Sequence, residues 1–222
     1  MTAAGVHQAH PGAAPAPAGQ PGQAALRLLG MFLVSRRVPA ALAVLAGLGA
    51  LMWAALHWHW NIAGGPAAQQ VIPLAIETGA AAVIAVASYG PFGEPERATG
   101  RWLPWLRLAS ALILTTAAVG ALAAGATGGY LLGGTPALVR DVGGMAGLGL
   151  LSAVALGGPF GWTGPMAYWL ITESALAEGW TTPWIWPGRP PDDTGAAICA
   201  GLFFAAGLAA FTVRGARTSV RD

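Results

Sequence analysis

Four ionisable residues lie inside or beside long apolar runs and are the best placed in this chain to do chemistry in a membrane: Glu77, Arg140, Asp141 and Glu173. Ionisable side chains are costly in lipid and usually face a bundle interior or a cavity. The two glutamates could line a transport path or carry protons. Alternatively, Arg140 forms a structural buried pair, either with Asp141 beside it or with Glu77 or Glu173 across the bundle, or a carboxyl stays neutral away from water. The residue types leave these interpretations open.

The densest charge cluster of the chain lies in the stretch GPFGEPERATGRWLPWLR, residues 90–107. It holds five of the charged residues, among them Glu94, Glu96, Arg97 and Arg101. Gly and Pro end the apolar run before it, and glutamates near the start of a short helix would complement the helix dipole. Such a helix could dock into a groove of another protein. The other interpretation is a solvated loop whose arginines only fix the membrane topology.

The alternating His and Trp residues of LHWHWNI, residues 56–62, do not predict a metal site. On a helix His57 and His59 point about 200° apart, so they cannot share one ion. We instead expect an aromatic belt, in which Trp side chains anchor helix ends at the membrane interface. The predicted anchors are Trp53, Trp58, Trp60, Trp184 and Trp186.

Catalysis and nucleic-acid binding are not predicted. All 11 basic residues are arginine, so the lysine of an ATP-binding Walker A loop is missing. The sequence holds no Gly-x-Ser-x-Gly and no His-Glu-x-x-His motif, and its carboxylates are scattered over different apolar segments. A net charge of +2 is too small to indicate a nucleic-acid partner. We therefore expect no enzyme activity, no metal and no cofactor in this chain.

The elements that would position these residues are membrane-spanning helices. The chain is 55% hydrophobic and only 9% charged, against about 25% charged residues in soluble domains. A span needs roughly 20 mostly apolar residues. Six segments qualify: 38–58, 69–89, 103–125, 137–157, 163–179 and 195–214. We predict an all-α integral membrane protein with six transmembrane helices, preceded by an N-terminal interfacial (elbow) helix over 23–37.

The predicted organisation is a disordered tail (1–22), a transmembrane domain (23–217) and a short cytoplasmic tail (218–222). Arginines gather before the first span, between the second and third spans, and after the sixth. Cytoplasmic loops carry an excess of Arg and Lys. Both termini and the 90–107 cluster are therefore expected in the cytoplasm. The exclusive use of arginine fits the codon usage of a high-GC bacterium, which predicts a bacterial cell membrane.

The elbow helix, the six spans and the Glu-x-Glu-Arg-x-x-Gly-Arg loop between spans two and three together resemble the permease subunit of ABC-2-type transporters, over about residues 24–217. The resemblance implies that this loop forms a coupling helix, which seats on a separate ATP-binding subunit. It also implies a second permease chain, ATP bound only by the partner subunit, and an export function. The segment 180–193 would then be a partly helical, re-entrant extracellular loop.

Two other functions stay open at this stage. The first is a non-transporting membrane scaffold or accessory subunit, whose charged loop recruits a cytoplasmic partner. The second is a proton-coupled secondary carrier that uses Glu77 and Glu173.

Overall fold

The computed structural model describes residues 38–58, 66–88, 103–180 and 182–216. Its elements are α2 (Val38–His57), α3 (Pro66–Ala87), α5 (Leu103–Gly125), α6 (Gly134–Leu156), η2 (Gly158–Phe160), α7 (Thr163–Ala177), η3 (Trp186–Gly188) and α8 (Thr194–Arg214). Several predictions lie outside these residues: both predicted tails, the elbow helix, His59, Trp60, and the loop that carries Glu94, Glu96, Arg97 and Arg101.

Every element in the described part of the chain is helical, as predicted. Five helices are long and apolar enough to cross a bilayer: Val38–His57, Gln70–Ala87, Leu103–Gly125, Gly134–Leu156 and Thr194–Arg214. These helices indicate a membrane-embedded protein. The remaining predicted span, 163–179, corresponds to α7. This helix has only 15 residues, or about 22 Å at 1.5 Å per residue, against a hydrocarbon core of about 30 Å.

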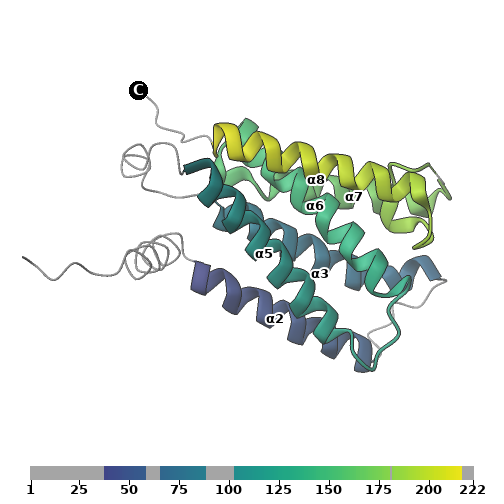
Figure 1. The fold of residues 1–222 in the computed structure, drawn as a ribbon. Coiled ribbons are helices and arrows are strands. Elements are labelled where there is room, and N and C mark those ends of the chain that lie inside the picture. The colour runs from purple at the N-terminus through teal and green to yellow at the C-terminus, as the bar shows by residue number, and fades with distance from the viewer. Residues whose placement is uncertain (1–37, 59–65, 89–102, 181, 217–222) are drawn as a thin grey trace, which may run out of the picture.

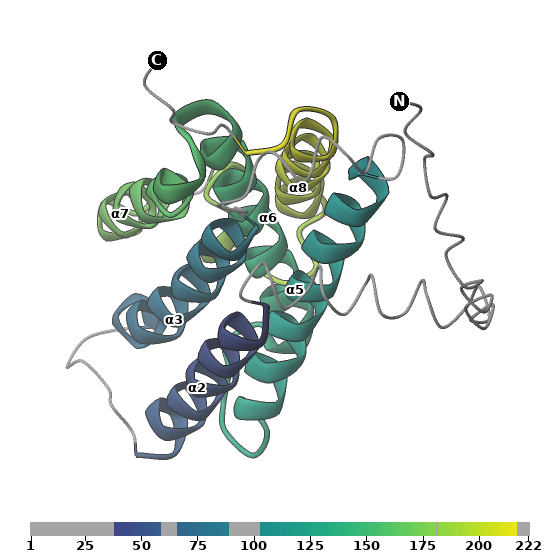
Figure 2. The same cartoon turned by 90° about the vertical axis from the view of Figure 1, so that its left-hand side faces the viewer.

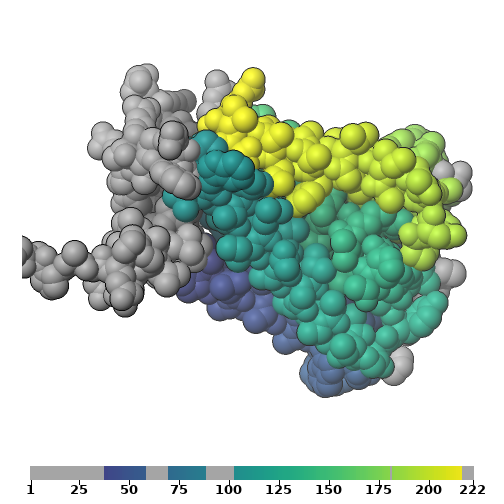
Figure 3. Space-filling model, in the orientation of Figure 1, coloured from purple at the N-terminus to yellow at the C-terminus, as the bar shows by residue number. Residues whose placement is uncertain are grey.

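The helix α6 forms the centre of the bundle, with α3, α5, α7 and α8 packed around it (Figures 1 and 2). Within the most apolar part of each helix, 67% of α6 is buried but only 22% of α8. In the space-filling view α8 covers one side of α6 and α5 and leaves its outer surface open (Figure 3). The large apolar side chains on that open surface, such as Leu202 and Val213, are therefore suited to face lipid or another chain.

The long helices run back and forth between two ends of the bundle (Figure 1). At one end α2 begins and α8 ends, and the Arg107 guanidinium at the start of α5 lies against Gly215. The turn between the end of α6 and the start of α7 also lies at this end (Figure 1). Gly161 in this turn contacts Ala85 near the end of α3, which places the end of α3 there too. At the opposite end, Gly128 after α5 lies beside His57 at the end of α2.

Glycines let two pairs of helices approach to backbone contact. On α6, Gly147 lies against the backbone of Phe203 and of Gly207 in α8. In the same way Gly49 of α2 lies against Gly125 of α5. Helix association in lipid depends on such close packing, because apolar surfaces gain little by leaving one apolar medium for another.

Candidate functional site

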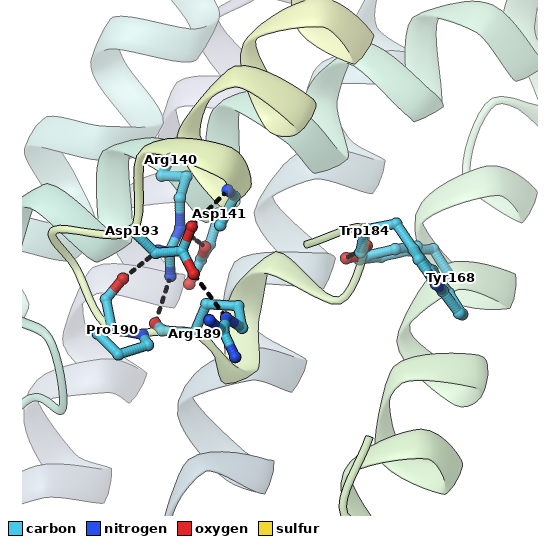
Figure 4. Close-up of polar contacts among 8 residues, drawn as sticks. Arg140, Asp141, Tyr168, Trp184, Arg189, Pro190 and Asp193 are labelled. Atoms are coloured by element: carbon cyan, nitrogen blue, oxygen red, sulfur yellow. Dashed lines mark hydrogen bonds and ion pairs between the residues drawn. The ribbon is translucent and has the colours of Figure 1, made fainter. Parts of the chain in front are cut away.

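The chain between α7 and α8 turns back into the bundle. We call residues 182–193 the capping segment. Its prolines prevent a regular helix, and only the short turn η3 forms within it. Trp186, at the start of η3, is fully buried. Its indole stacks on the Tyr168 ring of α7 at a centroid distance of 4.3 Å, and the Tyr168 hydroxyl donates a hydrogen bond of 2.9 Å to the carbonyl of Trp184 (Figure 4).

The insertion of Trp186 is deep. Its ring lies 5.6 Å from that of Phe203 in α8, which is about 13 Å along the helix from the first residue of α8. On the other side the indole lies against Gly144 of α6 and next to Ala200 of α8. A larger side chain at Gly144 would occupy the space of the indole. The capping segment is therefore built into the bundle and is not a surface loop.

Arg140 of α6 makes three hydrogen bonds, two of which hold the capping segment. Its Nε donates to Asp141 Oδ1 at 2.9 Å, its Nη1 to the carbonyl of Pro190 at 2.8 Å, and its Nη2 to the carbonyl of Arg189 at 3.2 Å (Figure 4). The planar guanidinium suits this task because its donors point in a fixed fork. Both Arg140 and Asp141 are buried, so these bonds satisfy groups that water does not reach.

Glu77 of α3 lies close enough to this pair to interact electrostatically with both Asp141 and Arg140. The side chain is only 4% exposed, and its Oε2 has no hydrogen-bond partner among the described residues. It lines a small pocket of about 50 Å³ between α3 and α6. The residues around this α3/α6 pocket are Gln70, Pro73, Leu74, Glu77, Tyr130, Leu131, Leu132, Asp141 and Pro187.

The structure thus brings together three of the four predicted intramembrane residues. Arg140 forms its ion pair with Asp141, which is one of the pairings that the sequence left open; no ion pair joins it to Glu77 or Glu173 among the described residues. The same guanidinium that contacts Asp141 also reaches the carbonyls of Arg189 and Pro190 in the capping segment. Glu173 lies on α7 near Trp169 and is not among the residues that line the α3/α6 pocket.

The tryptophans divide into two groups. Trp53, Trp58 and Trp184 keep more than a third of their surface exposed, and their role as interface anchors stays a prediction. Trp186 is fully buried, so its prediction as an interface anchor is wrong. The physical reason is the slot that Gly144 and Ala200 leave for the indole. Tyr168, which stacks on this indole, was not predicted as a site residue.

Comparison with known proteins does not identify a family for this chain. No protein-family model matches the chain, and neither does any curated protein or any solved structure. A function can therefore be inferred only from the residues and their arrangement.

Asp193, at the end of the capping segment, forms the N-terminal cap of α8. Asp193 Oδ1 accepts a hydrogen bond from the amide of Ala196 at 3.0 Å, which caps α8, and its Oδ2 accepts one from Arg189 Nε at 2.6 Å. These bonds lower the pKa of the Asp193 carboxyl below its usual range. A carboxyl with a lowered pKa in the folded state stabilises that state above its unfolded pKa, about 3.9, and this contribution is lost as the pH falls further.

We therefore expect Asp193→Ala to lower the melting temperature of the detergent-purified protein at pH 7. The difference from the unmodified chain should shrink as the pH falls below about 4. Asp192→Ala is the matched control, since Asp192 is exposed and lies outside the cap. Equal melting temperatures for the two variants at pH 7 would show that the N-terminal cap of α8 contributes nothing to stability.

Proposed function

We propose that this chain is the permease subunit of an ABC-2-type transporter, which exports a substrate with ATP hydrolysed by a separate subunit. It would lie in a bacterial cell membrane with both termini in the cytoplasm. One observation carries the proposal: the helix ends on either side of residues 89–102 lie at the same end of the bundle as the start of α2 and the end of α8. The charged stretch thus starts and finishes where an ATP-binding subunit would have to dock.

The distribution of arginine along the sequence supports this orientation. Arg107 and Arg214 lie at the proposed cytoplasmic end. The arginines toward the other end, Arg140 and Arg189, are both paired with carboxylates. The excess at the proposed cytoplasmic end comes from the sequence, because Arg36, Arg37, Arg97, Arg101, Arg217 and Arg221 adjoin the helix ends on that side. An excess of arginine at one end is the pattern of a cytoplasmic face.

The capping segment fits the opposite, extracellular end. In this proposal α7 is the fifth of six spans, shortened because the chain returns into the bundle through Trp186. This is the place where the resemblance implies a partly helical, re-entrant loop, and η3 supplies the helical turn.

A transport path would lie between two copies of the chain or between this chain and a similar one. The centre of the described bundle is filled by α6, most of whose residues are buried. It leaves no room for a path through the middle of the described bundle. A larger hollow, of about 470 Å³, opens instead on the surface between α5, α6 and α8. Small residues line much of it, including Gly143, Ala197 and Gly201, and these suit close approach of a second helix bundle.

In this mechanism ATP binding closes the two ATPase subunits, and the 94–101 stretch transmits their movement to α3 and α5. The docking interface must differ in free energy between the nucleotide states, because a partner that binds both states equally cannot shift them. Glu94, Glu96, Arg97 and Arg101 are the proposed contact residues.

The test is purification of the tagged chain from its native host in mild detergent, with co-purifying proteins identified by mass spectrometry. We expect a stoichiometric ATPase. The double variant Glu96→Arg/Arg97→Glu should reduce its recovery by about tenfold or more, because like charges facing each other across an interface cost at least 1–2 kcal/mol.

The matched control is Glu178→Arg, which reverses an exposed charge at the other end of the bundle. It should leave the ATPase bound. A chain that retains its ATPase after the 96/97 reversal does not dock through this loop. If no ATPase accompanies the unmodified chain under several mild conditions, the scaffold function becomes the better proposal.

A further inference from the structure

The α3/α6 pocket joins the solvent-exposed end of the bundle to its buried polar cluster. On one side is Tyr130, which is 79% exposed. On the other side are the carboxylates of Glu77 and Asp141, both nearly inaccessible. A small solute could therefore enter from the end of the bundle without crossing its packed core.

With both carboxyls ionised, the pocket would hold one more negative charge than its neighbour Arg140 can balance. Glu77 and Asp141 together carry two negative charges when ionised, and Arg140 carries one positive charge. The guanidinium hydrogen bonds go to Asp141 and to the carbonyls of Pro190 and Arg189. None of them goes to Glu77, whose buried Oε2 is left without a partner among the described residues. A buried charged group without a partner is costly, so this oxygen points to a ligand.

Size and donor type limit what that ligand can be. A volume of about 50 Å³ holds only a few water-sized groups, since one water needs roughly 10–15 Å³ by this measure. An organic substrate does not fit. Carboxylate, amide and water oxygens are preferred by hard cations, and the side chain of Gln70 adds an amide to the lining. A single excess negative charge is neutralised by a monovalent cation and overcompensated by a divalent one.

We propose that the α3/α6 pocket binds one Na⁺ ion per chain between the carboxylates of Glu77 and Asp141. The ion balances the excess charge and links α3 to α6 directly below the capping segment. Because Arg140 holds both Asp141 and the capping segment, the ion also supports the position of that segment. The site does not depend on the proposed transport function, and the ATPase experiment can fail without affecting it.

Binding of ²²Na⁺ to the full-length, detergent-purified protein tests the site directly. We expect saturable binding of one ion per chain at pH 7.5, measured in choline chloride at constant ionic strength. The melting temperature should rise with NaCl but not with choline chloride, because a ligand that binds only the folded state stabilises it by mass action. Glu77→Gln, which keeps the shape of the side chain, should weaken ²²Na⁺ binding at least tenfold.

Glu173→Gln is the matched control, because Glu173 is another glutamate of the bundle and lies outside the pocket. It should bind ²²Na⁺ like the unmodified chain. Equal losses in the two variants would place the ion elsewhere and overturn the proposal. The absence of saturable ²²Na⁺ binding to the unmodified chain would also overturn it, and would mean that a proton or water alone occupies the pocket. This measurement needs no variant, so it decides the question even if Glu77→Gln does not fold.

Discussion

Replacement of Arg140 by glutamine is expected to destabilise the folded protein by about 3–5 kcal/mol, the range found when one partner of a buried ion pair is removed. The variant leaves the Asp141 carboxylate, 6% exposed, without its counter-charge. It also removes the donors to the carbonyls of Arg189 and Pro190. Unfolding in mixed micelles by titration with sodium dodecyl sulfate measures the change in the free energy of unfolding.

Two controls separate the buried pair from a general effect of lost charge. Arg189→Gln removes the other ion pair of the capping segment, in which Arg189 is 29% exposed, and should cost at most about 1 kcal/mol. The double variant Arg140→Gln/Asp141→Asn should be more stable than Arg140→Gln, because no uncompensated charge remains on Asp141. If Arg140→Gln costs no more than Arg189→Gln, Arg140 does not hold the capping segment in solution.

The helices could be predicted from the sequence because lipid imposes a simple length rule. The predicted span 103–125 coincides with α5, and 195–214 differs from α8 by one residue. The predicted span 163–179 is a helix over Thr163–Ala177, but α7 is not among the five helices long enough to cross a bilayer. Hydropathy does not distinguish a helix that crosses the bilayer from a shorter apolar helix packed within the bundle, because both are apolar.

The site could be predicted only in part. The cost of charges in lipid singled out Glu77, Arg140 and Asp141. Two of the acceptors of Arg140, however, are the carbonyls of Arg189 and Pro190, and every residue has a carbonyl. No residue type reveals such a contact. That Glu77 approaches this cluster depends on how α3 packs on α6, which a single sequence does not specify.

Trp186 illustrates the same limit. Tryptophans near helix ends usually mark the membrane interface, and nothing in the segment itself shows that one of them turns inward. The signal lies elsewhere in the chain, in the small residues Gly144 and Ala200 that leave room for the indole. The spacing of Gly144, Gly147 and Gly149 predicts close helix packing, but it does not predict which element each glycine contacts.

Gly147→Ala is expected to destabilise the protein by about 1–3 kcal/mol or more, the usual cost of overpacking a core. A methyl group at this position would overlap the backbone of Phe203 and Phe204 in α8. A flexible side chain could rotate away, but a helix backbone cannot. Relief therefore requires α6 and α8 to separate, which also loosens the contact of Gly207 with Gly147. Titration with sodium dodecyl sulfate again measures the change.

Gly120→Ala is the matched control, because it makes the same change inside α5, at a position that does not line the surface hollow and where a methyl group would meet nothing within 4 Å. Alanine favours a helix over glycine by up to about 1 kcal/mol, so this variant should be neutral or slightly stabilised. The opposite signs matter more than either magnitude, because helix propensity alone predicts that both variants gain stability. Equal effects of the two substitutions would mean that α6 and α8 do not touch at Gly147. The central position of α6, and with it the attachment of the capping segment through Arg140, would then have to be revised.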